Sequence, residues 1–89
     1  MAKSIHLEIV TPRQIVFEGE VENFTAPGVM GPFEVLYNHA PIVAALNAGA
    51  FEYTELGGAT QTLKITGGFL ELHKNRGTLL ADGLETASI

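Results

Sequence analysis

The stretch that decides the fold is Gly31-Pro-Phe-Glu-Val-Leu-Tyr-Asn-His-Ala-Pro-Ile-Val-Ala-Ala-Leu46. It is followed by Thr66-Gly-Gly-Phe-Leu-Glu-Leu-His-Lys-Asn-Arg-Gly-Thr-Leu-Leu-Ala-Asp82. The first segment predicts a short strand over 33–36, a His-Ala-Pro turn and an apolar strand over 42–46. The second predicts strands over 69–73 and 78–81, joined by a tight turn at 75–77. Neither segment contains recognisable catalytic chemistry, which favours a structural role.

The rest of the chain has the same rhythm of short strands, with no helical period. Alternating apolar residues over 5–10 are typical of a half-buried strand. Further strands are expected over 15–18, 21–26, 50–56 and 60–66, with Gly19 ending the first of them. Gly57-Gly58 predicts a two-residue hairpin turn, and Ala26-Pro27-Gly28-Val29 fits a type II turn with Gly28 at positive φ.

Nine or ten strands at this spacing predict an all-β protein with little or no helix. A β-sandwich fits better than a closed barrel, because too few inward positions are polar for a barrel with a polar lumen. Eight residues are expected in the core: Phe24, Phe33, Leu46, Leu63, Ile65, Leu70, Leu72 and Leu79.

The composition of the chain excludes several classes of function. The 89 residues predict one small domain, and 46% hydrophobic against 17% charged residues is enough to build a core. The net charge of −5 with scattered basic residues argues against nucleic-acid binding, which needs a clustered cationic face. No apolar run is long enough to span a bilayer, so membrane association is expected only through a partner.

The three histidines are the obvious candidates for chemistry, but they lie more than thirty residues apart without ligand-spaced neighbours. His6 and His73 are interpreted as solvent-facing strand residues. His39 lies in a turn, where it either bonds the backbone or contacts a partner. We expect Gly67-Gly68 to serve close backbone packing and Gly28 and Gly31 to serve turn geometry. We therefore expect no metal, no cofactor and no enzymatic activity from this chain.

Val29 and Met30 lie at the tip of a Pro-Gly…Gly-Pro loop, where polar residues are more usual. Two interpretations stay open. Either the tip folds back over the end of the sandwich, or it forms a rigid apolar finger for a partner, a use to which methionine is well suited.

Taken together, these segments resemble the epsilon subunit of F-type ATP synthases (delta in mitochondria). The stretch 33–46 resembles the family's Leu-Gly-Ile/Val-x-Pro-Gly-His-Ala-Pro-Leu motif, and 66–82 resembles its Gly-Gly-Phe/Ile-Leu-Glu-Val…Val-Thr-Val-Leu-Ala-Asp pattern. Glu34 and Tyr37 replace the usual glycine and proline here. Asn38 replaces the second glycine, a mild change because asparagine tolerates left-handed φ/ψ.

The resemblance implies a ten-stranded β-sandwich of two five-stranded sheets over residues 1–82, with a short tail over 83–89. It implies a non-catalytic rotor subunit that links the gamma shaft to the membrane c-ring, on the cytoplasmic face of a bacterial inner membrane. The residues then expected to face the c-ring are Gly28, Val29, Met30, Gly31 and Pro32, and those expected to face gamma are Thr11 and His39.

Members of this family commonly continue into a C-terminal helical hairpin that binds nucleotide and inhibits hydrolysis. This sequence ends at Ile89, and we interpret it as a natural short form rather than a truncated chain. Residues 83–89 could form at most about two helical turns, which is marginal in water. We therefore expect this chain neither to bind ATP nor to inhibit hydrolysis by its own conformational change.

Two other functions are considered. One is a free-standing β-sandwich that binds a small ligand or a peptide, for example by adding a strand at an exposed edge. The other is a small hydrolase, which the lack of a nucleophile–base arrangement makes remote.

Overall fold

The computed structural model describes residues 3–85, and among these it contains strands and turns but no helix. The all-β prediction is confirmed. The eight strands are β1 (Ile5–Val10), β2 (Ile15–Ala26), β3 (Phe33–Leu36), β4 (Ile42–Leu46), β5 (Gly49–Glu55), β6 (Thr60–Ile65), β7 (Gly68–His73) and β8 (Arg76–Ala81).

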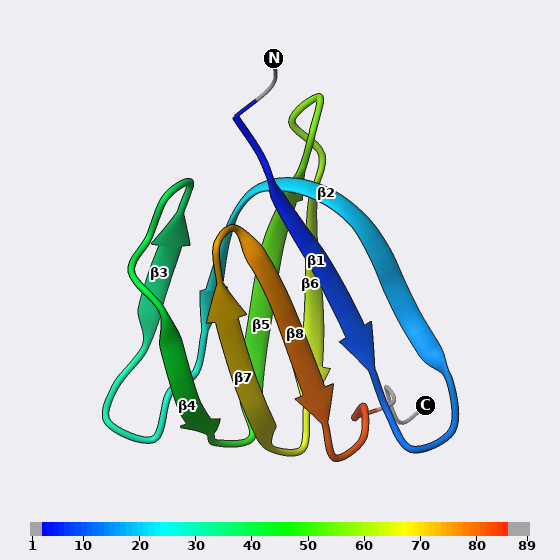
Figure 1. The fold of residues 1–89 in the computed structure, drawn as a ribbon. Coiled ribbons are helices and arrows are strands. Elements are labelled where there is room, and N and C mark those ends of the chain that lie inside the picture. Colours follow the sequence, from blue (N-terminus) through cyan, green and yellow to red (C-terminus); the bar gives the residue numbers. More distant parts are fainter. Residues whose placement is uncertain (1–2, 86–89) are drawn as a thin grey trace.

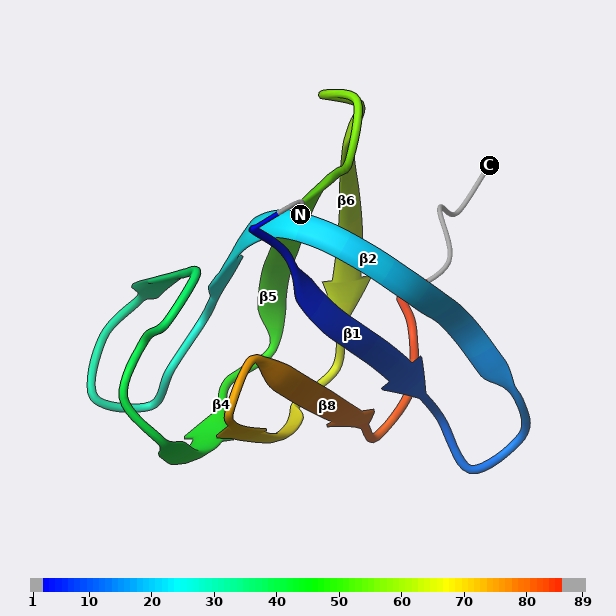
Figure 2. The same ribbon diagram turned by 45° about the horizontal axis from the view of Figure 1, so that its top comes forward.

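All eight strands belong to one curled sheet with the order β4-β7-β8-β1-β2-β5-β6, and β3 pairs with β2 beside this path. The sheet folds back on itself as a half-barrel, with β4, β7, β8 and β1 on one side and β5 and β6 on the other (Figures 1 and 2). The expected ten strands in two five-stranded sheets are not found in residues 3–85. The strands described there form a single continuous ladder.

The twelve-residue strand β2 accounts for one strand of the difference and for the continuity of the sheet. Gly19 does not end a strand, because it pairs in register with Leu7 and the ladder continues through it. The first half of β2 pairs with β1, and its second half pairs with β5 and β3. The register shifts between Val21 and Asn23, where an irregularity of this kind increases local twist. The two strands predicted over 15–18 and 21–26 are therefore one bent strand that serves both sides of the half-barrel.

Strand β8 connects the C-terminal hairpin to the N-terminal strand of the chain, since it pairs antiparallel with β7 and parallel with β1. The β7–β8 turn is centred on Lys74 and Asn75, both at positive φ, so the turn predicted at 75–77 begins one residue earlier. The predicted close packing at Gly67-Gly68 is confirmed. A Cβ added to Gly68 would lie 2.5 Å from the carbonyl oxygen of Leu80.

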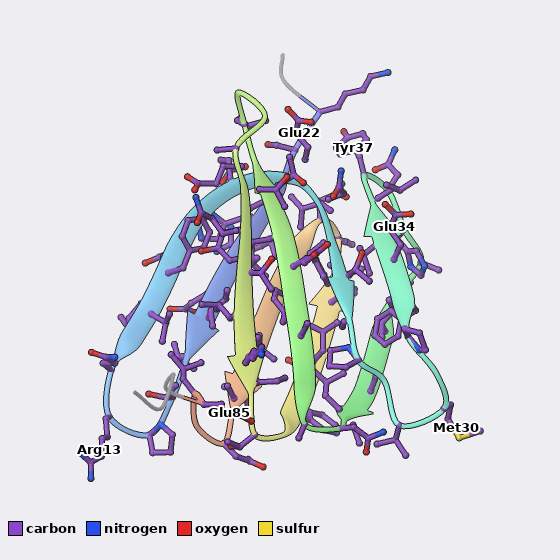
Figure 3. All side chains as sticks on the ribbon, turned by 180° about the vertical axis from the view of Figure 1, so that it is seen from behind. Arg13, Glu22, Met30, Glu34, Tyr37 and Glu85 are labelled. Carbon is purple, nitrogen blue, oxygen red and sulfur yellow. The ribbon has the colours of Figure 1, made fainter. Side chains whose placement is uncertain are left out.

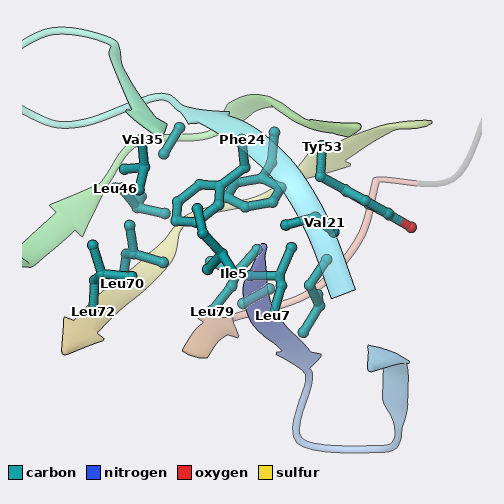
Figure 4. Packing of buried hydrophobic residues seen from close by; sticks show 14 of the residues in the cluster. Ile5, Leu7, Val21, Phe24, Val35, Leu46, Tyr53, Leu70, Leu72 and Leu79 are labelled. Atoms are coloured by element: carbon teal, nitrogen blue, oxygen red, sulfur yellow. The ribbon is translucent and has the colours of Figure 1, made fainter. Parts of the chain in front are cut away.

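The core fills the space inside the curl (Figure 4). Of the predicted core residues, Phe33 and Leu63 are only partly buried and pack against the cluster. Phe33 lies beside the loop before β3, and Leu63 lies on β6, the last strand of the sheet order. The buried cluster comprises Ile5, Leu7, Ile9, Val21, Phe24, Ala26, Val35, Leu46, Phe51, Tyr53, Ile65, Leu70, Leu72, Leu79 and Ala81.

The segment after β8 returns to the sheet. Leu84 forms an antiparallel bridge with Ile65, and the amide of Glu85 donates to the carbonyl oxygen of Lys64 at 2.7 Å. Part of the predicted tail, 83–85, is therefore held against β6, while 86–89 lies outside the described residues. Within residues 3–85 there is no helix of the length and hydrophobicity needed to span a bilayer.

Candidate functional site

The loop between β2 and β3 is closed by a tight turn. The amide of Gly31, at φ 124°, donates to the carbonyl oxygen of Gly28 at 2.9 Å, and the amide of Val29 donates to Ala45 at 3.0 Å. The type II turn predicted over 26–29 is wrong, because Gly28 is not at positive φ. Glycine is needed there for space instead. A Cβ on Gly28 would lie 2.6 Å from the carbonyl oxygen of Gly31.

The tip of this loop projects into solvent. Met30 is 99% exposed and Val29 is 54% exposed, and Met30 stands at one corner of the molecule (Figure 3). Met30 therefore does not fold back over the end of the sheet. The alternative, an apolar finger available to a partner, fits its position.

A groove of about 510 Å³ lies between this loop and the chain from His39 into β4. His39 Nδ1 lies 2.8 Å from the carbonyl oxygen of Ala40, so this ring nitrogen donates a hydrogen bond to the backbone. The structure thus places His39 beside the loop that we expected to face a different partner. The remaining lining residues are apolar or glycine: Gly28, Val29, Met30, Gly31, Phe33, Ile42, Val43, Ala44 and Ala45.

The turn that carries His39 is tied to the β7–β8 turn by two asparagines. Asn75 Nδ2 donates to Asn38 Oδ1 at 2.9 Å, and the amide of Asn38 donates to Asn75 Oδ1 at 2.7 Å. Asn38 is at φ 66°, as its replacement of a glycine led us to expect. The amide of His6 also donates to the carbonyl oxygen of Asn75 at 2.8 Å. The turn that carries His39 is therefore anchored to the β7–β8 turn and, through Asn75, to β1.

Thr11 lies elsewhere, in the β1–β2 turn. Its amide donates to the carbonyl oxygen of Gln14 at 2.9 Å, and its hydroxyl accepts from the amides of Arg13 and Gln14 at 3.3 Å. It lines a second hollow of about 440 Å³, together with Asp82 and Leu84. Figure 3 shows Arg13 and Met30 at opposite corners of the same end of the molecule. The structure does not bring Thr11 and His39 together.

An apolar row crosses the outer face of the sheet near this end. The strand registers place its members side by side on five neighbouring strands, β4, β7, β8, β1 and β2. Ile15, Leu80 and Phe69 are 61%, 49% and 40% exposed. Exposed apolar side chains gathered over neighbouring strands are typical of an interaction site. The row consists of Ala45, Phe69, Leu80, Val10 and Ile15.

The next row is acidic where it crosses β7, β8, β1 and β2. Glu8 pairs with Glu18 on one side and with Thr78 on the other, and Thr78 pairs with Glu71. We call Glu71, Thr78, Glu8 and Glu18 the acidic row. Two residues further along β1 from Glu8, His6 lies between Arg76 of β8 and Glu20 of β2.

His6 is held by two carboxylates on β2. Its Nδ1 lies 2.7 Å from Glu20 and its Nε2 lies 3.2 Å from Glu18, while Ser4 donates to Glu20 at 2.6 Å. The pKa of His6 is raised above its ordinary value of 6.5, chiefly by the hydrogen bond to Glu20, and the partial loss of hydration opposes this. The pKa of Glu20 is lowered below 4.5, first by the hydrogen bond from Ser4 and then by that from His6.

These pKa directions set the pH range in which the cluster stabilises the fold. Because the pKa of His6 is raised in the folded state, His6 stabilises the fold below about pH 6.5. This stabilisation is lost as pH rises through the folded pKa. Because the pKa of Glu20 is lowered in the folded state, Glu20 stabilises the fold above about pH 4.5. This stabilisation is lost as pH falls through the folded pKa. We expect His6→Gln to lower the melting temperature slightly at about pH 5.5 and by less at about pH 9. A larger deficit at the higher pH, measured by thermal denaturation, would contradict this.

The described residues hold no catalytic grouping. Among residues 3–85, no three His, Cys, Asp or Glu side chains converge as metal ligands, and no charged or polar residue is buried. What the surface offers instead is apolar contact area at the row, the groove and the loop tip.

Sequence reasoning found the loop but missed the apolar row and the His6 cluster. Both depend on registers between strands far apart in the chain, above all the parallel pairing of β1 with β8. One signal was present in the sequence. Val10, Phe69 and Leu80 are apolar at positions that the alternation assigns to the outer face.

Comparison with known proteins identifies relatives over almost the whole chain. The family described as "ATP synthase, Delta/Epsilon chain, beta-sandwich domain" matches residues 4–87. A protein named ATP synthase epsilon chain from Nitratidesulfovibrio vulgaris (strain Miyazaki F) is 45% identical over 98% of this chain and 64% of its own length. One of the same name from Chlorobaculum tepidum is 40% identical over 90% of this chain and 91% of its own length. The chain thus spans slightly less than two thirds of the first of these relatives.

Two solved structures share the fold. A chain in the Euglena gracilis mitochondrial ATP synthase, in a structure of OSCP, F1 and c-ring, superimposes with a TM-score of 0.88 at 21% identity, covering 96% of this chain and 54% of that one. A chain in the central stalk and c-ring structure of the Tetrahymena thermophila mitochondrial ATP synthase gives a TM-score of 0.77 at 15% identity, covering 91% and 65%.

Proposed function

This chain belongs to the family of ATP synthase delta and epsilon chains, and from that membership we propose that it is a non-catalytic central-stalk subunit of an F-type ATP synthase. It links the gamma shaft to the membrane c-ring and so couples ion translocation to ATP synthesis. The names of its relatives and the central-stalk and c-ring setting of a similar fold support this role.

Within the structure, the observation that carries the proposal is the exposed apolar row on the outer face of a close-packed sheet. A rotor element must hold partners firmly and transmit torque. An interior packed at crystal-like density transmits strain rather than absorbing it. Apolar rows on rigid strands supply contact area whose geometry the sheet fixes in advance.

We assign the two contact regions as follows. The loop Gly28 to Pro32 faces the c-ring, with Met30 as its apolar tip. The apolar row faces the gamma shaft, and Thr11 extends this region because it lies in the turn next to Ile15. His39 contacts gamma from the groove beside the loop, close to the boundary between the two partners.

The same role implies a location. The subunit is peripheral on the cytoplasmic face of a bacterial inner membrane, attached only through the gamma subunit and the c-ring. Its bacterial relatives support this location.

Met30→Asp tests the c-ring assignment. Placing a charge at an apolar contact leaves a buried, unpaired carboxylate, which costs affinity. Because Met30 is 99% exposed, the stability of the free chain should change by less than about 0.5 kcal/mol. In a membrane assay we expect weaker attachment to the membrane sector and lower ion-driven ATP synthesis. Met30→Leu is the matched control and should retain both, whereas full coupling with Met30→Asp would refute the assignment.

We expect no nucleotide site in this chain. Calorimetric titration of the chain with Mg-ATP at millimolar concentration should show no saturable heat. Saturable binding would mean that the role is not purely mechanical.

A further inference from the structure

The outer face of the sheet carries an unbalanced negative charge beside the apolar row. Glu8 and Glu18 pair directly on neighbouring strands, an arrangement of like charges that destabilises a sheet. Within residues 3–85 the ion pairs are the two that His6 makes, so neither Glu8 nor Glu71 has an ion-pair partner in this part of the chain. The acidic row lies two residues along the strands from the apolar row, a distance of about 7 Å.

The contacts of His6 require a protonated ring. A carboxylate only accepts hydrogen bonds, and both ring nitrogens of His6 face carboxylate oxygens, at 2.7 and 3.2 Å. A neutral imidazole donates from one nitrogen alone and would turn a lone pair toward Glu18 or Glu20. The bridge over both glutamates therefore belongs to the imidazolium form.

We propose that the acidic row and Glu20 receive lysine or arginine side chains that flank an apolar stripe on the shaft subunit, and that the His6 imidazolium competes with them for Glu18 and Glu20. This rests on the proposed function. The occupant follows from charge complementarity. A partner that covers the apolar row also covers the adjacent carboxylates, and basic side chains on that partner offset their charge.

The groups around His6 allow this competition. Ser4, just before β1, and Glu8 on β1 flank it, and Glu18 and Glu20 face it from β2. Arg76 opposes the positive form of His6 from β8, and beyond Arg76 lies His73 of β7. Ser4 donates to Glu20 Oε1, which keeps that carboxylate oriented toward the face when His6 is neutral.

Binding then varies with pH. At low pH the imidazolium occupies Glu18 and Glu20, and a basic side chain of the partner must displace it. As pH rises through the pKa of His6, both carboxylates become available and binding tightens. By linkage, the bound partner lowers the affinity of His6 for its proton by the same factor. Because the glutamates are exposed and His6 is only half-buried, we expect a change of only about two- to fivefold, reduced further by added salt.

The experiment measures the dissociation constant of the full chain for its cognate gamma subunit at about pH 6 and about pH 9, at low ionic strength. Wild type should bind about two- to fivefold more tightly at the higher pH. His6→Gln should lose that difference. His73→Gln is the matched control and should keep it, because His73 is exposed on the same face and forms no ion pair with a carboxylate among residues 3–85.

Two outcomes would overturn the proposal while leaving the proposed function intact. One is tight wild-type binding that does not change with pH, and the other is an equal pH response in wild type and His6→Gln. Failure of the wild type to bind gamma at either pH would instead contradict the proposed function itself. Circular dichroism at both pH values establishes that each variant is folded.

Discussion

Phe24→Ala should lower the free energy of unfolding by about 3–5 kcal/mol. Phe24 is fully buried on β2, the strand shared by both sides of the half-barrel, and its ring stacks on Phe51 with centroids 5.4 Å apart. Its truncation leaves a cavity that the rigid sheet cannot close. A domain of this size has a total stability of roughly 5–10 kcal/mol, so the variant should be close to unfolding.

Urea denaturation with linear extrapolation measures this loss. Leu56→Ala is the control, because Leu56 is an exposed leucine next to the β5–β6 turn and its truncation should cost less than about 0.5 kcal/mol. A cost for Phe24→Ala no greater than that of Leu56→Ala would show that the described core does not hold the fold together.

Leu80→Asp should weaken binding to the gamma shaft by at least about thirtyfold, the effect of losing a hot-spot residue worth about 2 kcal/mol. Leu80 lies in the middle of the apolar row, between Phe69 and Val10. A short charged side chain there would be buried against the partner without a counter-ion. The free chain should stay folded, because Leu80 is about half exposed.

Ala50→Asp is the control for Leu80→Asp. Ala50 is an exposed apolar residue on β5, which lies outside the apolar row on the other side of the half-barrel, so a new aspartate there should preserve binding to gamma. Surface plasmon resonance with immobilised gamma subunit distinguishes the two variants. Equal affinity of Leu80→Asp and wild type would remove the apolar row from the interface.

The elements that sequence reasoning predicted correctly are those set by local chemistry. Alternation over 5–10 predicted β1, and the asparagine at position 38 adopts the left-handed conformation expected of it. Gly57 and Gly58 both adopt positive φ between β5 and β6, as the predicted hairpin requires, although the connection spans residues 56–59 and not two residues. Each of these depends on a few adjacent residues, so the sequence alone was enough.

The strand count failed because it depends on long-range pairing. Gly19 looks like a strand end in the sequence, but Leu7 pairs with it and the strand continues. Of the two interaction surfaces, likewise, the one set by local sequence could be predicted and the one set by strand pairing could not. The loop tip at Met30 was predictable from the surrounding glycine and proline. The apolar row, in contrast, exists only because five strands from distant parts of the chain align Ile15, Leu80 and their neighbours.

Reconstitution of a membrane ATP synthase from which the epsilon subunit has been removed tests the proposed mechanical role most directly. The measured quantity is ion-driven ATP synthesis before and after the full chain is added back. We expect the chain to bind the depleted enzyme and to restore coupled synthesis. A chain that does not bind, or that binds and leaves synthesis at the depleted level, would contradict its role as a link between shaft and ring.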